Sequence, residues 1–195
     1  MTKHADVASS ADVKGAIPAL ASLAGHIGDP AVRNRGTIGG SVANNDPAAD
    51  YPSAVLGLGA TVVTTSRQIA ADDFFKGVFE TALEPGEIIT GFLYPLPKRA
   101  AYCKFPHPAS GYAMTGVFVV DTGAGIRVAV TGAGPGVFRW KEAEAALGKN
   151  FSASALESLS VKADDLNTDI HASAEYRANL VKVMAQRAVT AVGGK

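Results

Sequence analysis

A pair of adjacent glycines constrains the backbone of this chain more than any other feature. Gly39 and Gly40 lie in the segment Thr37–Ser41. Glycine has no Cβ, so backbone amides here can approach a ligand closely, and oriented amides in such a concavity bind phosphate. Asp50, a short distance along the chain, supplies a carboxylate for sugar or ring atoms of the same ligand. A glycine pair is also common at a plain bend, so a ligand site and a structural bend both stay open.

Composition excludes several classes of protein. The chain has 195 residues, with 18 basic and 18 acidic side chains, so no net field draws it to nucleic acid or to a membrane surface. No apolar run reaches the ~20 residues of a membrane span, and Met1–Asp6 lacks the apolar core of a secretory signal. Cys103 is the single cysteine and the four histidines are scattered. We therefore expect a cytoplasmic protein with no intrachain disulfide, no all-cysteine iron–sulfur cluster and no metal site.

The first half of the chain alternates helix and strand signals. Ser9 or Ser10 is suited to cap a helix that runs to Ala16, and Pro18 is suited to the first turn of a second helix. Further along, the pattern predicts a turn at Asp29-Pro30, a bend at Gly39-Gly40, a helix over Tyr51–Leu58, a strand over Thr61–Ser66, a short turn or helix over Asp72–Phe75 and a strand over Glu87–Tyr94.

The second half reads as a small antiparallel sheet with helices packed on it. The pattern predicts strands over Ala101–Phe105, Tyr112–Asp121 and Ile126–Thr131, a hairpin turn over Thr122–Gly125, and helices over Lys141–Leu147, Ser152–Val161 and from Ser173 onward to Gly193-Gly194. Because the pattern changes at Pro95–Ala100, we expect two domains, 1–97 and 98–195. The predicted class is α+β, an α/β lobe followed by the antiparallel sheet domain.

Three stretches of the sequence resemble a known family. Gly28–Pro52, which includes Arg33-Asn34-Arg35-Gly36, resembles the FAD-binding subunit of the xanthine dehydrogenase and carbon monoxide dehydrogenase family of molybdenum hydroxylases. Lys104–Ala113 resembles the start of the C-terminal domain in the carbon monoxide dehydrogenase-like branch of that family. Asp169–Arg177 is also similar to the family pattern, and its expected role is structural, with Ser173 as a helix cap.

The resemblance implies a set of FAD-contacting residues. It places Thr37, Ile38, Gly39, Gly40 and Ser41 against the pyrophosphate and ribityl chain, Asp50 in a hydrogen bond to the flavin, and Ile27, Ile88 or Ile89, Lys104 and Tyr112 near the cofactor. The residues by themselves leave other roles open. One of Ile88 and Ile89 fits a core strand by alternation, Lys104 fits a solvated surface position, and Tyr112 fits the opening of a strand with its ring in the core.

A second glycine cluster, Gly132–Gly136, imitates a phosphate loop but fails its pattern. A dinucleotide fingerprint needs glycine where Val137 stands. We therefore expect a plain turn here, and no residue of the chain is predicted as a catalytic acid, base or nucleophile.

The resemblance also implies function and partners. It implies an oxidoreductase subunit whose flavin takes electrons from the [2Fe–2S] clusters of a small subunit, while a large subunit holds molybdopterin and oxidises the substrate. Family subunits begin with roughly another 60–80 residues, about the size of a small domain, which carry a second glycine-rich loop. This chain alone is therefore expected to bind FAD weakly or not at all, to be inactive in isolation and to self-associate. The alternatives are a fragment that only contacts partner subunits and, more distantly, a free-standing oxidase of the vanillyl-alcohol oxidase fold.

Overall fold

The computed structural model describes residues 1–193, so the Gly194 part of the predicted helix end at Gly193-Gly194 lies outside the described residues. The first quarter of the chain is a run of short helices: α1 (His4–Ser9), α2 (Ala11–Ala16), α3 (Pro18–Gly25), α4 (Pro30–Arg35), α5 (Ile38–Asn44) and α6 (Tyr51–Leu58). Their starts follow from local chemistry. The Ser10 hydroxyl caps α2, the Asp29 carboxylate caps α4, and Pro18 and Pro30 occupy first-turn positions, where a missing amide costs nothing.

Two small antiparallel sheets complete this lobe. Strands β1 (Thr61–Thr64), β2 (Gln68–Ala70) and β5 (Ile89–Leu93) form one sheet in the order β2-β1-β5. Helix α7 (Ala71–Phe74) leads into the hairpin of β3 (Phe75–Gly77) and β4 (Glu80–Thr81). Strand β5 is at one edge of its sheet, and it contacts α5.

The second half is a four-stranded antiparallel sheet in the order β6-β7-β8-β9. Its strands are β6 (Arg99–Pro106), β7 (Ala113–Asp121), β8 (Ile126–Thr131) and β9 (Phe138–Arg139), followed by α8 (Lys141–Lys149), the 3₁₀ turns η1 (Ala153–Leu156) and η2 (Ala163–Asp165), and α9 (Ala174–Ala191). The predicted hairpin turn between β7 and β8 is confirmed by the bond from Thr122 N to Gly125 O, 2.9 Å.

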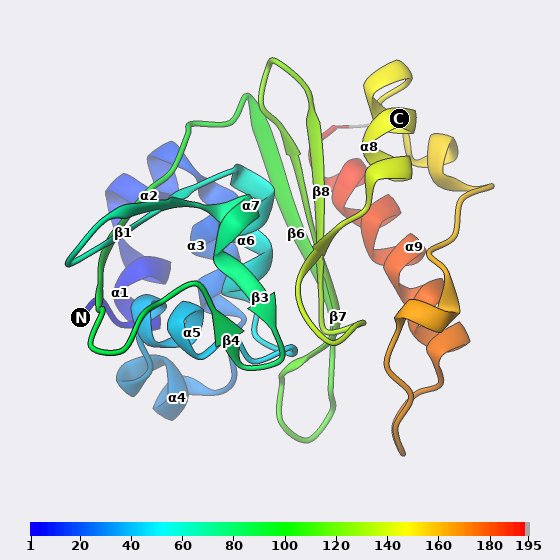
Figure 1. Cartoon of the computed structure of the whole chain (residues 1–195). Coiled ribbons are helices and arrows are strands. Elements are labelled where there is room, and N and C mark those ends of the chain that lie inside the picture. Colours follow the sequence, from blue (N-terminus) through cyan, green and yellow to red (C-terminus); the bar gives the residue numbers. More distant parts are fainter. Residues whose placement is uncertain (194–195) are drawn as a thin grey trace.

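The sheet is covered on both faces. Figure 1 shows it edge-on between the N-terminal helices on one side and α8 and α9 on the other. Every residue of β7 is buried for this reason. Phe118 and Val120 belong to the core shared with the N-terminal lobe, and Val117 and Val119 belong to the core under α9, as the alternation of a strand requires. The mixed α+β class expected from the sequence is confirmed.

Polar contacts tie the N-terminal lobe to the sheet. Arg127 on β8 donates to Leu56 O at 2.7 Å and forms an ion pair with Asp72 at 2.8 Å. The Thr131 hydroxyl donates to Ala49 O at 2.6 Å. The two-domain division near residue 97 stays a prediction, and limited proteolysis of the 95–98 connection is its test.

Three sequence expectations are wrong in detail. Asp29-Pro30 is the start of helix α4, because a capping carboxylate followed by proline serves a helix start as well as a turn. Gly39-Gly40 is not a bend but the first turn of α5. The helix expected over Ser152–Val161 is a single 3₁₀ turn, since its closely spaced serines offer side-chain bonds that compete with the helical ladder, as the Ser152–Ser154 hydroxyl contact shows. Helix α1 lies where the sequence pattern predicts no element.

Candidate functional site

The N-terminal turn of α5 forms the floor of the site. Thr37 caps the helix, and its hydroxyl accepts a hydrogen bond from Gly40 N at 3.1 Å. A Cβ added to Gly39 would meet no atom within 4 Å, whereas one added to Gly40 would lie 3.0 Å from the Thr37 hydroxyl. The backbone at Gly39 therefore borders open space, and a ligand can reach it without a side chain in the way.

Two cavities adjoin this turn and share Met1, Thr37 and Gly40 in their linings. Their volumes are about 510 and 560 Å³, in the range of small-molecule and cofactor sites. The first is lined in part by Ile27, Thr37, Gly40, Ser41, Asp50 and Tyr112, and the second by Thr37, Ile38, Gly39, Gly40, Ile88 and Ile89. The structure thus brings together the residues implied by the resemblance, except that Lys104 lines neither cavity and contacts Asp50 instead.

Lys104 is buried, so the expectation of a solvated surface lysine is wrong. Its side chain is 6% exposed and pairs with the Asp50 carboxylate, itself 2% exposed, at 3.0 Å. The ammonium also donates to His26 O at 2.7 Å and to Gly111 O at 2.9 Å. Three acceptors match the three protons of the ammonium, and this satisfies a charge that would otherwise be costly to bury.

The Asp50 carboxylate receives a second donor from the sheet. The Tyr102 hydroxyl donates to Oδ1 at 2.5 Å. Burial raises the pKa of Asp50, while Lys104 and Tyr102 act in the opposite direction. Burial and the neighbouring Asp50 together raise the pKa of Tyr102 well above its ordinary value. The result is a neutral phenol and an anchored acidic group at the wall of the first cavity.

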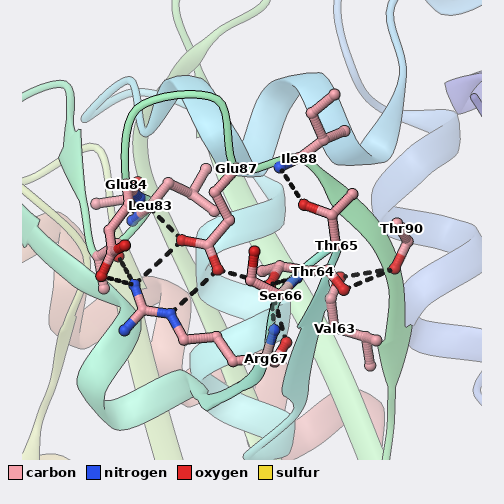
Figure 2. A network of polar contacts seen from close by, with 12 residues as sticks. Val63, Thr64, Thr65, Ser66, Arg67, Leu83, Glu84, Glu87, Ile88 and Thr90 are labelled. Carbon is pink, nitrogen blue, oxygen red and sulfur yellow. Dashed lines mark hydrogen bonds and ion pairs between the residues drawn. The ribbon is translucent and has the colours of Figure 1, made fainter.

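A polar network holds the loop that carries Ile88. Figure 2 shows the Arg67 guanidinium between Glu84 and Glu87, with the Glu87 carboxylate also accepting from Thr64. The contacts measure 3.1 Å from Arg67 Nε and 2.6 Å from the Thr64 hydroxyl to Glu87 Oε1. Arg67, followed by Thr64, lowers the pKa of Glu87 to about 2, so the carboxylate stays ionised at neutral pH.

The two isoleucines next to this network, Ile88 and Ile89, differ in burial. Ile89 lies in β5 and packs against the core of the lobe, while Ile88 is 64% exposed. One core isoleucine of the pair is what alternation predicted. Both isoleucines line the second cavity, and Ile88 is the more exposed of the two.

A short loop places Tyr112 beside the first cavity. His107 N donates to Tyr112 O at 2.8 Å, Gly111 N donates to His107 O at 2.9 Å, and Gly111 takes a φ of +70° that favours glycine. Tyr112 precedes β7 and is 47% exposed. The alternative in which its ring fills the core is therefore wrong.

The other motifs are structural. Gly132 takes a φ of +80° at a turn after β8, as expected for a plain turn. Arg177 is buried and donates to Met114 O, Gly132 O and the Asp169 carboxylate at 2.7 to 2.9 Å, which ties the start of α9 to the sheet. Within residues 1–193, no three His, Cys, Asp or Glu side chains are grouped to hold a metal ion, and no helix is long and apolar enough to span a membrane.

Two family models together cover almost the whole chain. The FAD binding domain in molybdopterin dehydrogenase matches residues 1–97, and the CO dehydrogenase flavoprotein C-terminal domain matches residues 100–192. The nicotine 6-hydroxylase medium subunit of Paenarthrobacter nicotinovorans is 35% identical, over all of this chain and 74% of the relative. The chain belongs to the FAD-binding subunits of the molybdenum hydroxylases. The glyceraldehyde dehydrogenase medium chain of Sulfolobus acidocaldarius is 32% identical, over 96% of this chain and 72% of the relative.

Solved structures of this family agree with the fold. Carbon monoxide dehydrogenase from Hydrogenophaga pseudoflava superposes with a TM-score of 0.86 at 34% identity, over 98% of this chain and 72% of that one. Quinoline 2-oxidoreductase from Pseudomonas putida 86 gives 0.85 at 28% identity, over 98% and 72%. The chain is thus an oxidoreductase subunit with FAD as its cofactor, and molybdopterin and iron–sulfur clusters belong to other subunits of such complexes.

Proposed function

We propose that FAD lies in the two cavities around the start of α5. The convergence of ten of the eleven implied residues on these cavities supports this most strongly. The glycine-lined turn offers backbone amides to the pyrophosphate, since Gly39 borders open space. The residues present therefore fit a dinucleotide.

The remaining side chains suit the flavin end of the cofactor. The Asp50 carboxylate would accept a hydrogen bond from FAD, and Ile27 and Tyr112, which line the same cavity, would supply apolar contacts to it. Ile88, exposed at the second cavity, would contact the part of the dinucleotide that lies there. Apolar walls with a few fixed polar groups are typical of cofactor pockets.

The subunit then transfers electrons within a larger complex. In this proposal a large molybdopterin subunit would oxidise the substrate, and a small subunit with two [2Fe–2S] clusters would supply the electrons. This chain would hold the FAD that accepts them and releases them to an external acceptor. Bound FAD supplies a centre that accepts and releases electrons. The residues of this chain bind and orient it, and we assign none of them as a catalytic acid, base or nucleophile.

The test is electron transfer in the assembled complex. The chain is produced with its partner subunits, and nicotine, carbon monoxide and glyceraldehyde, named in the relatives, serve as the first trial donors. We expect a yellow complex whose flavin is bleached anaerobically by the donor and recovers when an acceptor dye is added. A colourless wild-type complex would favour the alternative of a subunit that only contacts its partners. A flavin-depleted complex that still reduced the dye at the wild-type rate would contradict the proposed electron path.

A further inference from the structure

The Asp50 carboxylate is held by the opposite half of the chain. Asp50 is the residue before α6, yet its side chain makes no capping bond to that helix. Within residues 1–193, its carboxylate oxygens are bonded by Tyr102 and Lys104, which lie two residues apart on β6. Residues i and i+2 of a strand point to the same face. Strand β6 thus carries a matched donor pair aimed at one carboxylate.

A glycine in the neighbouring strand makes room for this tyrosine. Gly116 on β7 pairs with Lys104 across the ladder. A Cβ at Gly116 would collide with the Tyr102 hydroxyl and lie 2.9 Å from its Cζ. The φ of Gly116 is not in the left-handed region, so the backbone itself does not demand glycine. Glycine inside a strand often marks close approach of another group, and here the Tyr102 hydroxyl is the nearest such group, with the Thr131 methyl 3.0 Å away on β8.

The ring of Tyr102 is fixed as well as its hydroxyl. It stacks on Phe118, two residues along β7 from the glycine, with ring centroids 6.0 Å apart and an interplanar angle of 29°. The notch at Gly116 and the Phe118 ring together leave the phenol a defined position. Tyr102 therefore meets Oδ1 of Asp50 through rigid packing rather than through a flexible surface contact.

From this geometry we infer that Tyr102 is a positioning residue for the flavin site, acting through Asp50, and that Gly116 is glycine to admit it. The inference rests on the proposed function, because Asp50 must contact FAD for its orientation to affect binding. Tyr102 lines neither of the two cavities, so it affects the cofactor through Asp50 and not by direct contact.

Tyr102 also affects the charge on Asp50. Lys104 and Tyr102 face the carboxylate from β6, His26 faces it from the end of α3, and Tyr51 adjoins it on α6. A donor to an ionised carboxylate favours the ionised form. Loss of the Tyr102 hydroxyl therefore raises the pKa of Asp50 further. A protonated, neutral Asp50 is a weaker acceptor. As the pH is lowered, FAD affinity should therefore begin to fall at a higher pH in a variant without the Tyr102 hydroxyl than in the wild type.

The experiment compares Tyr102→Phe and Gly116→Ala with a matched control, Cys103→Ala. Cys103 lies between Tyr102 and Lys104 but packs under α9 on the other face of β6. The pH titration of the Asp50 carboxyl is followed by carbon-13 NMR in the full chain. FAD affinity against pH is measured in the assembled complex after removal and return of the cofactor.

We expect Tyr102→Phe to move the Asp50 midpoint upward and to weaken FAD binding by up to about tenfold, since an Asp50 carboxylate that is no longer held in place loses its own hydrogen bond to FAD. Gly116→Ala should do the same by displacing the hydroxyl. The double variant Gly116→Ala with Tyr102→Phe should lose no more FAD affinity than Gly116→Ala alone, because Gly116→Ala has already removed the hydrogen bond from Tyr102 to Asp50. Cys103→Ala should leave both measurements unchanged.

One result would overturn the positioning role of Tyr102, and a different result would overturn the proposed FAD site. A wild-type complex that binds FAD, with Tyr102→Phe equal to it in affinity and Asp50 midpoint, would overturn the positioning role alone. A wild-type complex without FAD would contradict the proposed function. Should Gly116→Ala fail to fold, Tyr102→Phe still decides, because it removes one oxygen and introduces no collision.

Discussion

Replacing Lys104 by methionine should destabilise the fold strongly, because it strands a buried charge. Lys104 and Asp50 are both almost fully buried, with their charged groups 3.0 Å apart. The substitution also removes the donor to His26 O and Gly111 O. Breaking one side of a buried ion pair costs about 3–5 kcal/mol. With a urea dependence of about 1–3 kcal/mol per molar, the unfolding midpoint should fall by at least about 1 M.

The loss should also depend on pH. Without Lys104 the pKa of Asp50, already raised by burial, rises further. An acid whose pKa is higher in the folded than in the unfolded chain holds more protons when folded, so stability falls as pH rises. The variant should therefore be weaker at pH 8 than at pH 5.

Urea unfolding followed by circular dichroism at both pH values is the assay. Adding Asp50→Asn to Lys104→Met should restore part of the lost stability, because it removes the unpaired charge. An Lys104→Met midpoint equal to that of the wild type at both pH values would refute the reasoning, since it would mean that the ion pair is not buried in solution.

Three further predictions rest on separate observations. Glu87→Gln should lower thermal stability at pH 7, and the deficit should shrink between pH 4.5 and 2, because Arg67 lowers the pKa of Glu87 to about 2; a deficit independent of pH would contradict this. Gly132→Ala should cost at least about 1 kcal/mol for its left-handed φ, with Gly125→Ala, which meets open space, as a near-neutral control in urea unfolding. Gly39→Val should leave the chain folded but lower the FAD content of the complex, measured by absorbance; wild-type FAD content would count against the site.

Helix starts could be predicted from the sequence because their chemistry is local. Ser10 and Ser173 each cap a helix through an amide three residues on, and a reader of the sequence can see both partners. The same signals mislead where two structures share them. Asp29-Pro30 fits a turn and a helix start equally. Gly39-Gly40 lies in helix α5, because Thr37 caps the start of that helix.

The polar centre of the site could not be found this way. Lys104 reaches Asp50 across 54 residues and Tyr102 reaches it across 52, and only the packing of the lobe on the sheet brings them together. The candidate cofactor residues came from likeness to a family, not from spacing. The available signal for Tyr102 was its i, i+2 relation to Lys104 on a strand, which gives a shared face but not the carboxylate opposite it.

The most direct measurement of the central claim is an experimental structure of the complex with bound FAD. The account predicts density for the pyrophosphate against Thr37–Ser41 and for the flavin end beside Asp50 and Tyr112. It also predicts that the Tyr102 hydroxyl still contacts the Asp50 carboxylate. FAD bound away from these two cavities, or a purified complex that contains no flavin, would contradict it.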